Sequence, residues 1–115
     1  MKIWFTVTGT RHYFGQGFLE RGMKVRLEKE PDNEYDREAI KVMLEGLGHI
    51  GHVANSPHTV LGESWSAGRI YDKIGDTAEG EVSFVLDKGV LCFLTLKDAA
   101  EDPDPETGED GQLTG

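Results

Sequence analysis

The length, composition and charge of the chain suit one small soluble domain. Of its 115 residues, 37% are hydrophobic and 29% are charged, and the net charge is −9 at pH 7. A chain of this length can bury one modest core. It contains no run of the roughly 18 to 20 apolar residues that a membrane-spanning helix requires. The acidic balance also excludes attachment to duplex DNA through bulk charge alone.

The negative charge is concentrated at the C-terminus. Residues 98–115 carry seven of the 21 acidic residues and no Lys or Arg, so the other 97 residues hold 14 acids against 12 bases, a net of −2. The segment has one large apolar residue, and we therefore expect a domain over residues 1–97 followed by a disordered acidic tail over 98–115. Such a tail could contact a partner, or it could mimic nucleic acid and cover a basic cleft.

The N-terminal residues and the single cysteine both indicate an intracellular protein. Met1 to Val7 lacks the apolar core and small-residue cleavage site of a signal peptide. Cys92 has no cysteine to pair with, and it lies in the apolar run 90–94. We predict that it is a small buried hydrophobic residue rather than a nucleophile or a metal ligand.

Most of the body follows the two-residue period of β-strands. Apolar and polar residues alternate in segments 3–8, 23–28, 40–44 and 82–86. Two more strands are expected, a short one over 49–53 after a glycine turn and an apolar one over 90–96. Asp87-Lys88-Gly89 predicts a three-residue hairpin loop. A helix is expected from Asn55-Ser56-Pro57, a cap followed by proline, to Gly68. The pattern predicts a mostly β domain of about six strands with one or two short helices, arranged as a bent sheet or small barrel.

The segment between the first two strands carries candidate binding residues. Arg11, His12, Tyr13 and Phe14 follow one another. Aromatic faces that stack on bases, next to a cation that meets phosphates, are typical of a site for single-stranded nucleic acid. The alternative is a hydrophobic loop that closes one end of a barrel, with Arg11 paired to a carboxylate.

A second candidate segment is the turn before the third strand. Tyr35 and Asp36 stand there, after a Pro-Asp-Asn turn. Asp36 could bond to backbone N–H groups, as Asp commonly does in turns. It could instead accept a strong hydrogen bond from a ligand hydroxyl, and it would repel a phosphate in that place.

The remaining motifs favour neither a metal centre nor an enzyme. His49 and His52 are three residues apart on a predicted strand, so we expect them on opposite faces, and zinc needs three or four converging ligands. His52 is better explained as a polar contact at the end of the strand. The sequence contains no nucleophile elbow, P-loop or dinucleotide fingerprint. We therefore expect a binding module with no catalytic residue, metal or cofactor.

Three motifs in order resemble the HIRAN domain family, over roughly residues 3–96. They are Gly9-x-Arg11-His12-Tyr13, then Val25-x-Leu27-x-x-Glu30-Pro31-x-Asn33-x-Tyr35-Asp36-x-x-Ala39-Ile40-x-Val42, and finally Ile50-Gly51-His52-Val53. The resemblance implies a modified OB-like β-barrel. In DNA-remodelling ATPases this domain captures the 3′-hydroxyl end of single-stranded DNA during replication-fork remodelling.

The resemblance also implies roles for individual residues. Arg11 and the following pair, His12 and Tyr13, would contact the backbone and terminal bases, and Tyr35 would help form the stacking pocket. Asp36 would accept a hydrogen bond from the 3′-hydroxyl, and His52 would support the terminal nucleotide.

Two positions depart from the family pattern. His12 replaces a second aromatic residue, tyrosine, and Asn55 falls near a position that carries lysine in a DNA-binding relative. The imidazole of His12 would stack less well on a base, although it can contact phosphate, and the uncharged Asn55 would weaken backbone binding and its salt dependence.

Two hypotheses therefore follow. A module for single-stranded DNA 3′ ends, in DNA repair or replication, predicts a positive cleft between the Arg11 and Asp36 loops. A protein-interaction adaptor predicts that Arg11 is neutralised by a neighbouring acid. Asp36 could accept from a 2′- or a 3′-hydroxyl, so RNA is also compatible.

Overall fold

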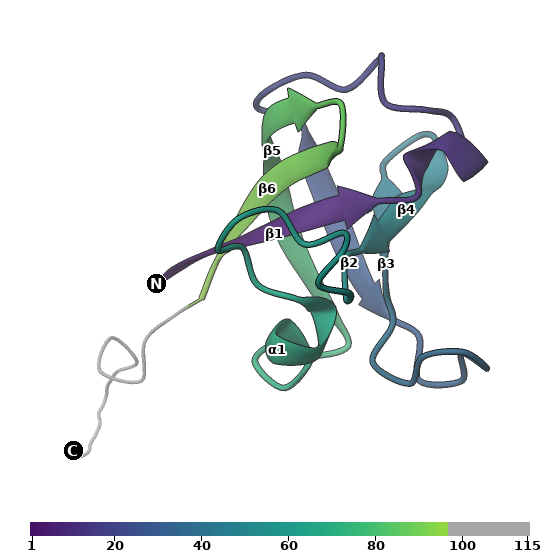
Figure 1. Cartoon of the computed structure of the whole chain (residues 1–115), viewed down its shortest axis with the longest axis vertical. Helices are drawn as coiled ribbons and strands as arrows, with labels where there is room; N and C mark the ends of the chain where they lie inside the picture. Colours follow the sequence, from purple (N-terminus) through teal and green to yellow (C-terminus); the bar gives the residue numbers. More distant parts are fainter. Residues whose placement is uncertain (97–115) are drawn as a thin grey trace.

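The computed structural model describes residues 1–96, which form a closed barrel of six antiparallel strands (Figure 1). The order around the barrel is β1-β4-β3-β2-β5-β6. The strands are β1 (Lys2–Thr8), β2 (Lys24–Lys29), β3 (Ile40–Leu44), β4 (Gly48–Val53), β5 (Thr77–Leu86) and β6 (Gly89–Thr95). The prediction of a mostly β barrel is confirmed. The predicted acidic tail lies outside the described residues.

The two-residue period of the strands sends alternate side chains into the barrel. In β1, Ile3, Phe5 and Val7 are buried, whereas Lys2 is exposed and Trp4 is half-buried. The other strands contribute the rest of the core, principally Val25, Leu27, Ile40, Val42, Ile50, Val82, Val90, Cys92 and Leu94. Cys92 is fully buried, as predicted, and burial raises the pKa of its thiol to about 12.

The barrel closes where β1 meets β4, and this seam positions the candidate site. Only Val7 and Thr8 pair with β4, opposite Val53 and His52. Gly51 lies at the seam, where a Cβ atom would stand 2.7 Å from the Thr8 carbonyl oxygen. Glycine is therefore required for the two strands to approach so closely. The chain leaving β1 continues directly into the segment that carries Arg11.

The predicted helix over 55–68 is wrong, because the helix begins only where that segment ends. Helix α1 spans Ala67–Tyr71, and the Ser66 hydroxyl accepts the capping hydrogen bond from the Arg69 backbone N–H at 3.3 Å. Upstream, the Trp65 N–H donates to the Trp4 carbonyl at 2.7 Å, so the backbone lies along β1 instead of coiling. The cap and proline signals at 55–57 therefore mark turns. Helix α1 covers the lower end of the barrel in Figure 1.

The other end of the barrel carries the long β1–β2 loop, over residues 9–23, and the short β3–β4 and β5–β6 turns. A 3₁₀ turn, η1 (Thr10–His12), follows β1. Leu86 pairs with Gly89, so the hairpin turn contains only Asp87 and Lys88, and the predicted three-residue loop is one residue too long. Within residues 1–96, no helix has both the length and the apolar character needed to cross a membrane.

Candidate nucleic-acid interface

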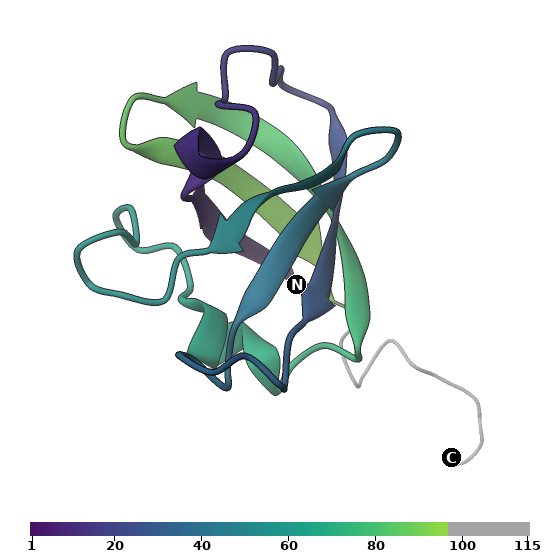
Figure 2. The same cartoon turned by 90° about the vertical axis from the view of Figure 1, so that its right-hand side faces the viewer.

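The predicted site residues surround β4 on one face of the barrel. Figure 2 shows this face, with β4 near its centre, η1 above it, the 30–39 loop below it and the 54–64 segment to one side. Arg11, His12 and Tyr13 come from η1 and its end, and Tyr35 and Asp36 come from the 30–39 loop. The sequence segments that were singled out separately therefore share one face of the fold.

Three rings form a cluster at the centre of this face. The ring centroids of Tyr13 and His49 are 4.2 Å apart, those of His49 and His52 are 4.7 Å apart, and those of Tyr13 and His52 are 6.4 Å apart. The prediction that His49 and His52 point to opposite faces is wrong. The β3–β4 ladder shifts register between Val42 and Met43, and such an irregularity interrupts the strict alternation of side chains.

The cluster holds His49 in its neutral form near neutral pH. Burial lowers the pKa of His49 below its ordinary value of 6.5, and the neighbouring His52 lowers it further. The Nε2–H of His49 donates to the Gly51 carbonyl at 2.9 Å, which acts in the opposite direction and is outweighed. A neutral ring beside Tyr13 provides an aromatic surface without a fixed charge.

The loop that carries Tyr35 is tied to the end of β4 at two points. The His52 Nε2–H donates to the Glu30 carboxylate at 2.8 Å. The Asn55 amide donates to Asp36 Oδ2 at 2.8 Å, and its oxygen accepts from the Gly68 N–H at 2.9 Å. These contacts fix the loop relative to the ring cluster.

Within the loop, Asn33 and Asp36 shape the backbone. Asn33 Oδ1 accepts hydrogen bonds from the N–H groups of Tyr35 and Asp36, and Asp36 Oδ1 accepts from the Glu38 N–H at 2.9 Å. Asp36 thus has the backbone-bonding role that was one of the two alternatives. Each of its oxygens has one partner, and an ionised carboxylate offers about four acceptor positions in all.

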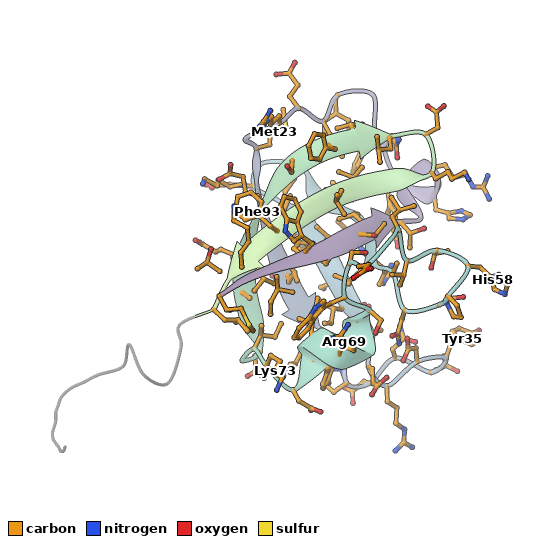
Figure 3. The ribbon with its side chains drawn as sticks, turned by 60° about the vertical axis from the view of Figure 1, so that its left-hand side comes forward. Met23, Tyr35, His58, Arg69, Lys73 and Phe93 are labelled. Atoms are coloured by element: carbon orange, nitrogen blue, oxygen red, sulfur yellow. The ribbon has the colours of Figure 1, made fainter. Side chains whose placement is uncertain are left out.

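Large aromatic side chains on this loop and on η1 are exposed. Tyr35 is 95% exposed, Phe14 is 54% exposed and Tyr13 is 40% exposed. Figure 3 shows Tyr35 projecting from the same side of the molecule as His58. These rings are therefore accessible to a ligand, and the loop that carries Tyr35 is anchored to the barrel.

Arg11 and His12 are exposed beside the cluster. Arg11 forms no ion pair with any other residue between 1 and 96. It therefore lacks the neutralising acid that the adaptor hypothesis predicts. The cleft next to it encloses about 730 Å³, but it lies between η1, residues 58–61 and the β5–β6 turn. This cleft does not include the Asp36 loop, so it is not the one predicted between the Arg11 and Asp36 loops.

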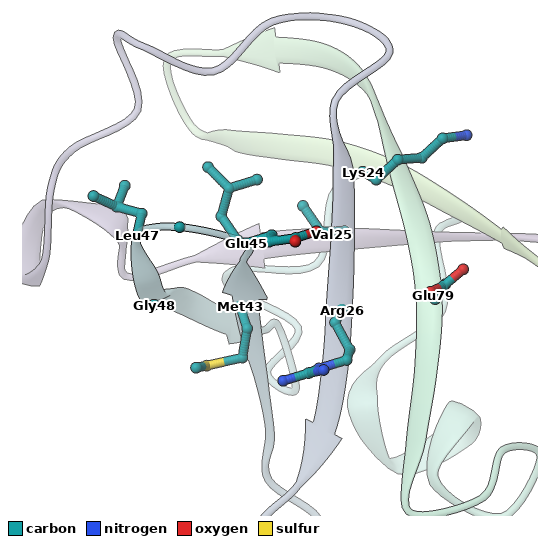
Figure 4. Close-up of a pocket in the computed structure, with 10 residues that line it drawn as sticks. Lys24, Val25, Arg26, Met43, Glu45, Leu47, Gly48 and Glu79 are labelled. Carbon is teal, nitrogen blue, oxygen red and sulfur yellow. The ribbon is translucent and has the colours of Figure 1, made fainter.

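A second depression lies between β2 and the β3–β4 hairpin and encloses about 500 Å³ (Figure 4). Its two cations are already paired. Lys24 contacts Glu81 at 2.5 Å, and Arg26 contacts Glu28 at 2.6 Å. In Figure 4, Arg26 points toward Met43. Because this charge is internally neutralised, the depression offers little to an anionic ligand.

Sequence reasoning missed several residues of this face. His49 joins the rings only because of the register shift, and Glu30 contacts His52 across 22 positions of sequence. Lys88 lies near Arg11 only through barrel closure. Within residues 1–96, no group of three or more His, Cys, Asp or Glu side chains is arranged to hold a metal ion.

Comparison with known proteins places the chain in a family. A HIRAN domain model matches residues 2–81. No curated protein sequence gives a significant match. The crystal structure of the HIRAN domain of human HLTF is similar, with a TM-score of 0.59 and 24% identity over 83% of this chain and 74% of that chain. A Lactobacillus plantarum protein of known crystal structure is similar with a TM-score of 0.50 and 25% identity, over 83% of this chain and 98% of that chain. Since the family model spans well over half of the sequence, the chain belongs to the HIRAN domain family.

Proposed function

We propose that this chain is a binding module, not an enzyme, that recognises the 3′-hydroxyl end of single-stranded DNA. Family membership supports a nucleic-acid-binding module in general. One observation carries the finer proposal. The exposed ring of Tyr35 stands beside an Asp36 carboxylate that Asn55 and the Glu38 N–H hold in place, on the face that also carries Arg11.

The chemistry of these groups suits the end of a strand. Tyr35 and the Tyr13 cluster offer faces on which bases stack, and Arg11 offers an unpaired cation for a phosphate. Asp36 can accept a further hydrogen bond from a hydroxyl, whereas its negative charge repels a phosphate at the same place. A strand that ends in a hydroxyl is therefore favoured over one that ends in a phosphate.

The two departures from the family pattern affect affinity more than end preference. The Asn55 side chain already forms hydrogen bonds with Asp36 and with the Gly68 N–H, so it supports the loop instead of contacting phosphate. His12 is exposed and offers a smaller ring than tyrosine. We therefore expect weak overall binding with a clear dependence on the 3′ group.

Fluorescence anisotropy with 5′-labelled oligonucleotides tests the proposal. The two oligonucleotides have one sequence and end in a 3′-hydroxyl or a 3′-phosphate, and the assay is run at low and moderate salt. A hydrogen bond to a charged group contributes about 1.5–3 kcal/mol, so the hydroxyl end should bind roughly ten- to hundred-fold more tightly.

Asp36→Asn is the informative variant, with Asp32→Asn as its control. Asn keeps an oxygen for the Glu38 N–H but removes the charge and the acceptor of the Asn55 amide, so the preference for the hydroxyl end should fall toward one. Asp32 is an exposed acid of the same loop, and its substitution changes the net charge equally. Equal loss of preference in both variants would show that general charge, and not Asp36, selects the end.

One observation favours a second candidate, an adaptor that binds another protein. Phe84, Val85 and Leu86 are 49%, 38% and 46% exposed near the end of β5. Consecutive exposed apolar side chains are typical of protein contacts. If neither oligonucleotide binds at low salt, this adaptor function becomes the leading hypothesis.

A further inference from the structure

The cleft beside Arg11 is lined by residues outside the Asp36 loop, and its lining suits a chain of phosphates. Arg11 and Lys88 are exposed cations in it, His12 and His58 add ring N–H groups, and Asp87 is its single acid. With both histidines neutral, the formal charge of the lining is +1, whereas the 97 residues before the acidic segment sum to −2. The cleft is therefore a locally positive part of an acidic protein.

Neither cation of this cleft is used elsewhere in the described structure. Among residues 1–96, the ion pairs are Lys24–Glu81, Arg26–Glu28, Lys41–Glu28 and His52–Glu30. Lys88 has the acidic Asp87 as its chain neighbour, yet the two form no ion pair. The charged groups of Arg11 and Lys88 therefore remain available to an anionic ligand.

Hydrogen bonds fix two walls of the cleft relative to each other. The Thr10 hydroxyl donates to Gln16 Oε1 at 3.1 Å, and the Gln16 amide donates to the Leu86 carbonyl. Gln16 thus connects η1 to the end of β5, next to the turn that carries Lys88. Because the walls of the cleft are already positioned, the protein loses little conformational entropy when a ligand binds.

The third wall is fixed to β1. The Leu61 N–H donates to the Thr6 hydroxyl oxygen at 3.1 Å, and the Thr6 and Ser64 hydroxyls are 2.9 Å apart. This attachment places His58 opposite η1. Figure 2 shows η1, the β5–β6 turn and the 54–64 segment along one side of the barrel, adjacent to the face that carries Tyr35.

We propose that this cleft, through Lys88 and His58, binds the phosphodiester backbone of single-stranded DNA on the 5′ side of the terminal nucleotides. The inference rests on the proposed function, because Arg11 is shared by the cleft and the end site and so orients the strand. The cleft supplies affinity that grows with strand length, whereas Asp36 supplies the preference for the 3′ end. The two properties can therefore be separated by mutation.

The test compares the binding of a trinucleotide and a decanucleotide, both with a 3′-hydroxyl, to the full chain and to Lys88→Ala and Lys88→Glu. Lys73→Ala is the control, since Lys73 is also an exposed lysine and lies just after α1, outside the cleft. Each phosphate contact on a single strand contributes about 0.7 to the slope of log affinity against log salt. Wild-type affinity for the decanucleotide should thus fall about 2.6-fold more than that of Lys88→Ala between 50 and 200 mM salt.

Three results are expected. Lys88→Ala lowers the affinity for the decanucleotide but not for the trinucleotide, Lys88→Glu lowers it further, and the hydroxyl-to-phosphate preference stays unchanged in both. Decanucleotide affinity and salt slope equal to wild type in both Lys88 variants would overturn the inference. So would Lys88-dependent binding of a synthetic peptide of residues 98–115 in place of DNA, because the cleft would then hold an acidic peptide.

The failure of one proposal can be told from the failure of the other. If the 3′ group has no effect but Lys88 still controls the length dependence, the end-recognition proposal fails and the cleft remains. If the 3′ preference is present and Lys88 has no effect on longer strands, the cleft proposal fails alone.

Discussion

Replacing Tyr35 by alanine should weaken binding without weakening the fold. The side chain is 95% exposed, so its removal uncovers no core. The hydrogen bond of this residue to Asn33 uses the backbone N–H, which alanine retains. The free energy of unfolding should therefore change by no more than about 0.5 kcal/mol. A stacked base contributes about 1–3 kcal/mol by alanine substitution, which corresponds to a roughly 5- to 150-fold rise in Kd.

Anisotropy with a 3′-hydroxyl oligonucleotide and urea denaturation measure the two quantities in parallel. Tyr35→Phe is the matched control, because it keeps the ring and loses only the hydroxyl, and its Kd should stay within about threefold of wild type. Wild-type affinity in Tyr35→Ala would refute the idea that this ring stacks on a base. Equal weakening in the alanine and phenylalanine variants would assign the effect to the hydroxyl instead.

Three further predictions concern the barrel that supports the site. The folded pKa of His49 lies below 6.5, so the unfolded chain binds the proton more readily, and stability should fall as pH decreases through about 6.5. Urea melts should show a smaller pH dependence in His49→Gln, and an equal dependence would contradict this. Cys92 should react with a thiol reagent only after unfolding, since it is buried and protonated; rapid native-state labelling would show otherwise. Gly51→Ala should destabilise the barrel by about 1–3 kcal/mol because its Cβ meets the Thr8 carbonyl, and an unchanged urea midpoint would show that the seam can relax.

The alternation of apolar residues was enough to predict most of the barrel strands, and the apolar run 90–94 was enough to predict the burial of Cys92. Both features follow from local patterning, because one face of every strand must be buried. The helix prediction failed for a different reason. The cap and proline signals around Asn55 are real turn signals, but tertiary hydrogen bonds from Trp65 and Leu61 to β1 hold that segment against the barrel as a series of turns. Contacts with the barrel therefore outweighed the local helix signals of residues 55–68.

The composition of the candidate site was partly predictable, but its geometry was not. Arg11, Tyr35 and Asp36 stand out in the sequence by residue type and by the turns around them. The ring cluster depends on the register shift between Val42 and Met43, and no sequence feature of β3 or β4 predicts this shift. The ties from Glu30 to His52 and from Asp36 to Asn55 join residues 22 and 19 positions apart, so they appear only once the barrel is closed.

The most direct test of the account is the ratio of two dissociation constants for the full-length chain. One oligonucleotide ends in a 3′-hydroxyl, the other ends in a 3′-phosphate, and both are measured in the same buffer at low salt. The hydroxyl strand should bind roughly ten- to hundred-fold more tightly, because Asp36 accepts a hydrogen bond from it and repels the phosphate. A ratio near one, with measurable binding of both strands, would contradict end recognition.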